Sequence, residues 1–181
     1  MLIGNFFKKI NPEFKNHYFS GINFNSQSCK KNDIFFAIKG NQFDGNKFVF
    51  DAISKGAKTI VHDKKFQGFK NDVLYLSFSN VRKTLAELSY KLFNPKINNL
   101  IAVTGTNGKS SICNFYFQIL DLNKKKVASL GTLGIKTQSK KFKASNTTMD
   151  SLHLSKYLKY LSDKKIDNVI LEASSHGLKQ H

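Results

Sequence analysis

The sequence predicts an α/β fold with two successive domains, a small N-terminal α/β domain and an incomplete P-loop-type domain built on a parallel sheet. Short apolar segments alternate with segments of helical periodicity, which is typical of parallel strands joined by right-handed crossovers. Residues 101–111, I-A-V-T-G-T-N-G-K-S-S, join an apolar strand to a glycine turn and a helix start. Ligands are therefore expected at the carboxyl ends of the strands.

The first domain is expected to span residues 1–95. Strands are predicted at 33–38, 58–61 and 73–76, and helices at 47–55 and 82–92, where apolar residues recur at helical spacing. Residues 93–99, F-N-P-K-I-N-N, combine Pro95 with three asparagines, which end a helix and loosen the chain. This composition places the domain boundary after residue 95.

The second domain, residues 96–181, continues the alternation. Strands are predicted at 100–103, 126–129 and 168–171, helices at 110–122 and 151–161, and a loop at 131–146. The glycine turn follows the first of these strands and Glu172 follows the last, so both are expected at one edge of the sheet.

The glycine turn has the features of a phosphate-binding loop. Gly105 and Gly108 allow backbone N–H groups to turn toward phosphate oxygens, Lys109 adds a cation, and Ser110 offers a hydroxyl to Mg²⁺. The dipole of the following helix favours an anion at the same place. The general pattern G-x-x-x-x-G-K-[ST] would place its first glycine at Val103, so a chance glycine turn with a solvated lysine is the alternative.

Glu172 ends an apolar run and opens E-A-S-S-H-G-L. A hard cation such as Mg²⁺ takes carboxylate and hydroxyl oxygens together with phosphate oxygens, so Ser110 and Glu172 are its candidate ligands. The alternative is a carboxylate that caps the following turn. His176 is ambiguous between a ligand, a phosphate partner and a histidine satisfied by backbone hydrogen bonds.

The composition indicates an ordinary globular chain. Its 181 residues are 40% hydrophobic, and the apolar runs are too short for a membrane span. The first residues, M-L-I-G-N-F-F-K-K-I-N-P-E-F, lack the uninterrupted apolar core of a signal peptide, so a cytoplasmic location without membrane association is expected. Cys29 and Cys113 have no metal-ligand or disulfide spacing and are expected to be reduced, partly buried thiols.

The formal net charge of +17 raises the question of nucleic-acid binding. Arg82 is the only arginine, and the lysines are scattered along the chain, whereas bidentate base recognition prefers arginine. The charge therefore predicts a solvated lysine surface and no nucleic-acid partner.

Several segments together resemble the Mur ligase family, most closely its MurE type, the UDP-N-acetylmuramoyl-L-alanyl-D-glutamate ligases that add a diamino acid in peptidoglycan synthesis. The resemblance lies in six segments: F-N-S and D-I-F-F-A-I-K-G-N-Q-F-D-G in the first domain, then V-T-G-T-N-G-K-S-S, L-G-T-L-G, N-T-T-M-D-S, and E-A-S-S-H-G-L-K-Q-H. Folylpolyglutamate synthetases share the G-T-N-G-K turn but lack the N-T-T and S-S-H-G-L pair.

The resemblance implies roles for individual residues. Lys109 and Glu172 correspond to catalytic positions, and Ser110 and Glu172 to the magnesium positions. The ATP loop corresponds to Gly105, Thr106, Asn107, Gly108, Lys109, Ser110 and Ser111. The uridine nucleotide positions correspond to Phe24, Ser26, Asn41, Gln42 and Phe43, and the muramoyl dipeptide positions to Asn146, Thr147, Thr148, Ser174 and Gln180. From the residues alone, the asparagine and threonines at 146–148 are equally suited to capping the next helix.

The chain departs from the family pattern at three places. The usual D-S-R is N-S-Q at residues 25–27, the usual threonine after the loop lysine is Ser110, and the usual proline of T-T-P-D is Met149. Serine keeps the hydroxyl, whereas loss of the arginine weakens whatever that side chain anchors.

The resemblance implies an ATP-dependent amide ligase that works through an acyl phosphate, uses ATP and Mg²⁺, and acts as a monomer on a UDP-N-acetylmuramoyl dipeptide and a diamino acid. The family has three domains, and the sequence ends within the second, so the chain by itself is expected to be inactive. A non-catalytic UDP-sugar or nucleotide-binding fragment is the alternative, followed by a basic nucleic-acid-associated NTPase. The residues do not distinguish between the diamino acids.

Overall fold

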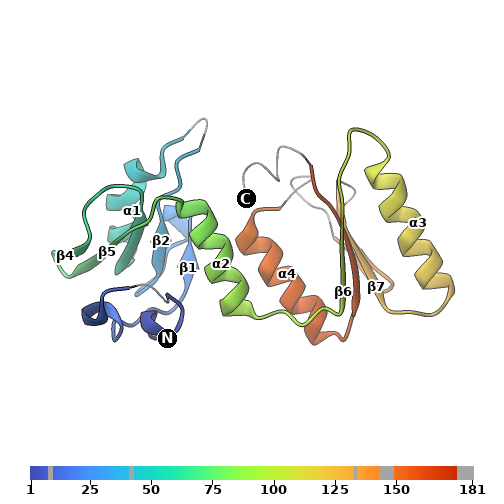
Figure 1. The fold of residues 1–181 in the computed structure, drawn as a ribbon, viewed down its shortest axis with the longest axis horizontal. Helices are drawn as coiled ribbons and strands as arrows, with labels where there is room; N and C mark the ends of the chain where they lie inside the picture. Colours follow the sequence, from blue (N-terminus) through green and yellow to red (C-terminus); the bar gives the residue numbers. More distant parts are fainter. Residues whose placement is uncertain (8–9, 41–42, 133, 143–148, 175–181) are drawn as a thin grey trace. The chain divides into compact units, whose positions relative to one another are not determined.

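The chain forms two compact units, Met1–Leu92 and Phe93–His181. The computed structural model describes residues 1–7, 10–40, 43–132, 134–142 and 149–174. Each unit has its own sheet with helices packed against it (Figure 1). The predicted α/β class with parallel-rich sheets is confirmed, and the division between the units lies three residues before the boundary placed after residue 95.

The first unit contains a sheet in the order β1-β2-β3-β5-β4. Its parallel strands are β1 (Ile22–Asn23), β2 (Ile34–Phe36), β3 (Thr59–His62) and β5 (Val73–Ser77), and the antiparallel edge strand is β4 (Gly68–Lys70). Helices α1 (Val49–Ser54) and α2 (Val81–Phe93) accompany it, with short 3-10 turns η1 (Ile3–Asn5), η2 (Pro12–Phe14), η3 (Ser26–Ser28) and η4 (Gly45–Phe48).

Alternation along the strands gives this sheet two apolar faces. Phe35, Ile60 and Val73 pack with Ala52 of α1 on one face. The neighbouring positions Phe36 and Val61 point the other way, and α2 buries Val81, Leu85 and Leu88. Helices on both faces explain why the parallel strands are almost entirely apolar.

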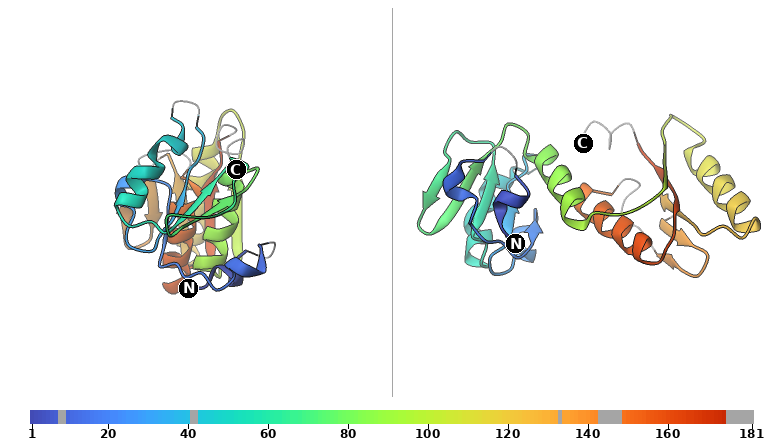
Figure 2. Two further views of the ribbon diagram at one scale, coloured as in Figure 1. Left: turned by 90° about the vertical axis from the view of Figure 1, so that its left-hand side faces the viewer. Right: turned by 60° about the horizontal axis from the view of Figure 1, so that its bottom comes forward.

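The second unit contains a sheet in the order β6-β10-β7-β8-β9. The strands β6 (Asn99–Val103), β10 (Asn168–Glu172) and β7 (Val127–Gly131) are parallel, and β8 (Gly134–Thr137) and β9 (Lys141–Phe142) continue the sheet in antiparallel fashion. Helices α3 (Lys109–Leu122) and α4 (Ser151–Asp163) lie on opposite faces of this sheet (Figures 1 and 2).

The two helices bury different sides of the same strands. Leu158 and Leu161 of α4 pack with Val169 of β10 and Leu130 of β7. The side chains of Cys113 and Phe117 are the buried residues of α3, which covers the other face. This arrangement brings the first turn of α3 to the carboxyl ends of β6 and β10.

The structure corrects three sequence predictions. The segment 131–146 is not one loop, because Gly131 belongs to β7 and β8 and β9 form an antiparallel extension. The helix predicted at 47–55 begins as the 3-10 turn η4 and becomes α-helical at Val49. Glu172 is the last residue of β10 and does not follow the strand.

No helix within the described ranges is long and apolar enough to cross a membrane. Cys29 and Cys113 are both free and buried, as expected for structural thiols. Burial raises the pKa of Cys29 to about 12 and that of Cys113 to about 11, and the carboxylate of Glu172 adds to the latter shift.

Candidate functional site

The glycine turn joins β6 to α3 at the carboxyl end of the second sheet. Gly105 has φ +145° and Gly108 has φ +80°, backbone conformations that strain residues with a Cβ atom. Gly108 is the N-cap of α3, so the turn passes directly into a helix of 14 residues. The positive end of the helix dipole therefore lies at this turn, where it favours an anion.

Lys109 bends back over the turn. Its Nζ donates to the carbonyl oxygen of Gly105 at 2.7 Å and to that of Thr106 at 3.2 Å. Lys109 is half-buried and its hydrogen bonds lie at the exposed surface of the turn, so its ammonium group adds positive charge there without the cost of full burial. This position suits a cation that contacts a bound polyphosphate.

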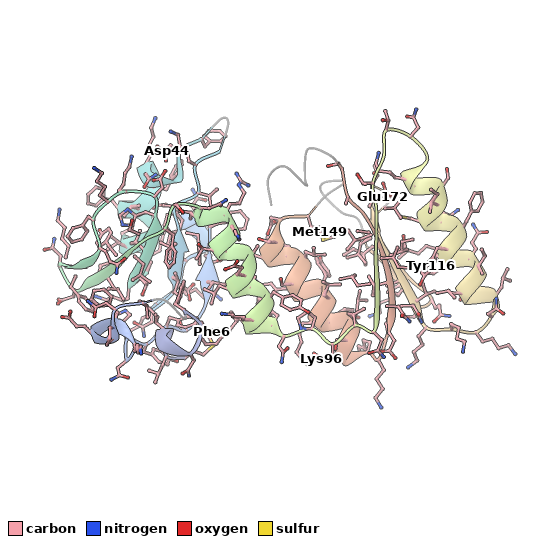
Figure 3. All side chains as sticks on the ribbon, viewed as in Figure 1. Phe6, Asp44, Lys96, Tyr116, Met149 and Glu172 are labelled. Carbon is pink, nitrogen blue, oxygen red and sulfur yellow. The ribbon has the colours of Figure 1, made fainter. Side chains whose placement is uncertain are left out.

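Glu172 lies at the same level of the sheet because of the strand register. Parallel pairing sets Glu172 opposite Val103, the last residue of β6 before the turn. Figure 3 shows the Glu172 side chain at the end of the sheet where the turn leads into α3. The Oγ of Ser110 donates to Oε2 of Glu172 at 3.0 Å. The two residues that the sequence suggested as magnesium ligands are therefore in contact, although 62 positions separate them.

Thr132 is a site residue to which the sequence analysis assigned no role. It directly follows β7, and its Oγ1 donates to Oε2 of Glu172 at 3.0 Å while its N–H donates to Oε1 at 3.3 Å. The signal was present in the segment L-G-T-L-G, where a hydroxyl residue follows an apolar strand. Because the expected strand ended at residue 129, the direction of the Thr132 side chain could not be assigned.

These residues surround a pocket of about 470 Å³. Its lining combines backbone of the glycine turn, hydroxyl groups, one ammonium and one carboxylate. The lining residues are Thr106, Asn107, Gly108, Lys109, Ser110, Ser111, Thr132, Glu172 and Ser174. A cavity of this size and polarity is suited to a phosphorylated ligand accompanied by a cation.

The donor atoms fit Mg²⁺. Ser110 and Glu172 supply a hydroxyl and a carboxylate oxygen, the hard ligands that this ion takes alongside phosphate oxygens and water. In the described part of the chain, no three His, Cys, Asp or Glu side chains gather into an all-protein metal site.

The remaining predicted site residues fall into two groups. Phe24 and Ser26 follow β1 and Phe43 lies in the connection after β2, so all three leave the carboxyl edge of parallel strands in the first unit. Ser26 is buried, whereas Phe43 is 70% exposed. The residues outside the described ranges are Asn41, Gln42, Asn146, Thr147, Thr148, His176 and Gln180.

Two protein-family models match the chain. Residues 18–91 match the model described as "Mur ligase family, catalytic domain", and residues 103–181 match "Mur ligase middle domain". The two matches lie on either side of the boundary between the compact units, and the second includes all nine lining residues of the pocket.

Individual relatives extend this similarity over most of the chain. The chain is 38% identical over 179 residues to UDP-N-acetylmuramoyl-L-alanyl-D-glutamate--2,6-diaminopimelate ligase of Rickettsia prowazekii (strain Madrid E), a match that covers 94% of this chain and 36% of the relative. It is 41% identical over 161 residues to the protein of the same name from Clostridium tetani (strain Massachusetts / E88), covering 87% and 33%. The chain thus spans about a third of the length of these relatives.

Solved structures agree with the sequence matches. A UDP-N-acetylmuramoyl-L-alanyl-D-glutamate--2,6-diaminopimelate ligase has a TM-score of 0.82 at 25% identity, over 99% of this chain and 37% of that one. The MurF ligase from Thermotoga maritima in complex with ADP has a TM-score of 0.56 at 24% identity, over 85% and 32%. The second similarity is one of fold.

Proposed function

Because this chain belongs to the Mur ligase family, we propose that it carries the ATP-binding and UDP-substrate-binding part of an ATP-dependent amide ligase of peptidoglycan precursor synthesis. The observation that supports this proposal is the convergence of Lys109, Ser110 and Glu172 on one polar pocket. The relatives named above suggest UDP-N-acetylmuramoyl-L-alanyl-D-glutamate and 2,6-diaminopimelate as the two substrates to be joined.

The proposed reaction has two steps. An oxygen of the substrate's terminal carboxylate attacks the γ-phosphorus of ATP, the bond to the β-phosphate oxygen breaks, and ADP leaves. The amine of the diamino acid then attacks the resulting acyl phosphate at its carbonyl carbon, forms the amide, loses a proton and releases inorganic phosphate. Phosphoryl transfer of this kind depends on positioning and charge neutralisation, which the pocket is built to supply.

Each residue has a part in this scheme. The backbone of residues 105–108 and the start of α3 bind the phosphates, and Lys109 neutralises charge that develops on them. Ser110 and Glu172 would hold Mg²⁺, which supplies electrostatic stabilisation of the phosphate oxygens when bound. Phe24, Ser26 and Phe43 are proposed to contact the uridine nucleotide, so that binding of this remote group orients the carboxylate.

A Lys109→Ala variant tests the assignment of the pocket. Removing a charge-assisted contact to phosphate should reduce the binding free energy by about 1.5–3 kcal/mol, which corresponds to a roughly 10- to 150-fold loss of affinity for Mg–ATP. Isothermal titration calorimetry measures this loss directly. Lys125→Ala is the matched control, because it makes the same change in net charge just beyond the other end of α3.

Equal affinity of the two variants for Mg–ATP would contradict the role of Lys109. Titration with the UDP-linked dipeptide and an amine-dependent phosphate-release assay complete the experiment. Amine-dependent phosphate release would support the ligase directly, whereas binding of both nucleotides without release is expected both of the nucleotide-binding part of a ligase and of a non-catalytic nucleotide-binding protein. A reaction that consumes ATP further suggests a cytoplasmic location.

A further inference from the structure

Thr132 makes two hydrogen bonds to Glu172 that the sequence does not predict. Its hydroxyl and its amide contact different oxygens of the same carboxylate, Oε2 at 3.0 Å and Oε1 at 3.3 Å. With the hydroxyl of Ser110, these groups give the carboxylate three donors. Glu172 is only 5% exposed, so these contacts replace water around a charged group.

Gly131, the residue before Thr132, leaves room for the same carboxylate because it has no side chain. A Cβ atom at Gly131 would lie 2.2 Å from Oε1 and 2.5 Å from Cδ of Glu172, which is closer than non-bonded atoms approach. Glycine is therefore required at the end of β7 for the carboxylate to occupy its position. The main chain at Gly131 limits the carboxylate on one side, and the Thr132 donors fix its orientation.

We propose that Thr132 is a positioning residue that holds the Glu172 carboxylate toward Ser110 and thereby prepares the cation position of the pocket. The inference rests on the proposed function. Ser110 is itself a candidate cation ligand, so its hydroxyl cannot be the only group that orients Glu172. Thr132 supplies that orientation independently of the cation, as outer-shell partners of metal-binding carboxylates do.

The test compares Thr132→Val, which removes the hydroxyl at similar volume, with Thr132→Ser, which keeps it. ATP binding is measured by calorimetry with Mn²⁺ as the probe ion and again in the presence of a chelator. We expect Thr132→Val to weaken Mn–ATP binding about tenfold, since loss of an outer-shell partner costs roughly 10- to 100-fold in metal affinity. Binding of metal-free ATP should change less than twofold, and Thr132→Ser should restore most of the metal-dependent affinity.

The control is Thr137→Val. Thr137 is buried in β8, and its Oγ1 donates to the carbonyl oxygen of Lys140 at 3.0 Å and accepts from the N–H of Lys140 at 3.0 Å. The substitution therefore removes hydroxyl hydrogen bonds that do not involve Glu172. A loss of stability alone would lower metal-dependent and metal-free binding together. The ratio of the two affinities should therefore change in Thr132→Val and remain constant in Thr137→Val.

Thr132→Ala provides a second hydroxyl-free variant should the valine protein fail to fold. Wild-type-like Mn²⁺ dependence in either folded variant would overturn the positioning role while leaving the proposed function intact. Failure of the unsubstituted chain to bind ATP with or without Mn²⁺ would overturn both. The two failures are thus distinguishable.

Discussion

Glu172 shows how a single charged residue is accommodated at the end of an apolar strand. Burying a carboxylate is unfavourable unless hydrogen bonds compensate, and here two hydroxyl groups and one amide do so. The donors come from the first turn of α3, which follows β6, and from the residue after β7, and these two strands lie on either side of β10. Parallel register is what aligns these strand ends, so the site depends on the sheet and not on one loop.

The sequence identifies most residues of this site, but not all of the contacts between them. The spacing of Gly105, Gly108 and Lys109 identifies a phosphate-binding turn, because few other functions require that combination. The pairing of Ser110 with Glu172 also follows, since strand ends meet at one edge. Thr132 was missed because the direction of a side chain just beyond a strand depends on where the strand ends.

A second buried polar residue, His62, lies at the end of β3 in the first unit. It is 5% exposed, its ring packs edge-on to Tyr75 with centroids 5.6 Å apart, and its Nδ1 accepts from the N–H of Lys64 at 3.3 Å. Its Nε2 is buried and has no hydrogen-bond partner among the described residues. Burial lowers the pKa of His62 below its ordinary value of 6.5, because a charged imidazolium would lack solvation there.

The lowered pKa makes stability dependent on pH. Below about pH 6.5 the unfolded chain binds a proton at His62 that the folded chain resists, so folding becomes less favourable as the pH falls. The stabilising contribution is complete above pH 6.5 and is lost as the pH falls toward the folded-state pKa. We expect urea unfolding followed by circular dichroism to show lower stability at about pH 5.5 than at about pH 7.5.

His62→Phe is the matched variant, since it keeps an aromatic ring against Tyr75 and removes the titration. Its stability should vary less between the two pH values than that of the unsubstituted chain. His17, whose pKa is also lowered by burial, accounts for part of the remaining variation. An unchanged pH dependence in His62→Phe would show that the imidazole is not responsible.

At the scale of the elements, α3 has two contrasting faces. Cys113 and Phe117 are buried against the sheet, and the Nζ of Lys136 lies 4.2 Å from the centre of the Phe117 ring. The opposite face carries an apolar stripe at helical spacing, with exposed fractions between 53% and 83%, formed by Ile112, Phe115, Ile119 and Leu122. The apolar periodicity of the sequence therefore overstates how much of this helix is core.

Two phenylalanines of α3 provide a direct comparison. Phe117 is 2% exposed and Phe115 is 62% exposed. Phe117→Ala should reduce the stability of the second unit by about 3–5 kcal/mol, because it opens a cavity beneath the helix. Phe115→Ala should change it by no more than about 0.5 kcal/mol, as is usual for surface positions. Amide hydrogen exchange in β7 and β10 reports on this unit specifically.

Phe115→Ala is the control for the phenylalanine side chain itself, since both substitutions are on one helix. Equal losses from the two variants would mean that the outer stripe of α3 is also covered by protein. Equal small changes would mean that the Phe117 ring does not support the sheet.

The elements predicted correctly are those with long or strongly apolar patterns. The helices beginning at Val81, Lys109 and Ser151 are found within one residue of their expected starts. Strands β1, β4 and β9 have only two or three residues, too few for alternation to be visible, and β8 contains Lys136 and Thr137 where an apolar run would be expected. Their positions are set by pairing with neighbouring strands, which local sequence does not encode.

At the scale of the whole molecule, the two units have the same type of sheet but carry different candidate binding residues. Each contains parallel strands whose carboxyl edge carries the candidate binding residues, with antiparallel strands added at one edge. The positive charge is not concentrated in this way. Of 29 lysines and arginines only Arg82 is an arginine. Among the described residues, the Lys159–Asp163 ion pair and the hydrogen-bonded contact of His153 with Asp150 are both at the surface.

A net charge of +17 predicts general attraction to polyanions, with a salt dependence that separates it from the pocket. The affinity for a polyanion that is bound through many weak lysine–phosphate contacts should fall roughly 10³–10⁵-fold between about 50 mM and about 200 mM salt. The fall should be the same for nucleic acids of different base sequence. Mg–ATP binding should fall far less, because it involves one lysine, Lys109, together with backbone and hydroxyl contacts at close range. Fluorescence anisotropy with two RNA and two DNA oligomers, and calorimetry with Mg–ATP, measure the two salt dependences.

Neither RNA nor DNA should stimulate ATP hydrolysis. Sequence-selective binding that persists at the higher salt, or stimulated hydrolysis, would favour a nucleic-acid-associated NTPase over the ligase.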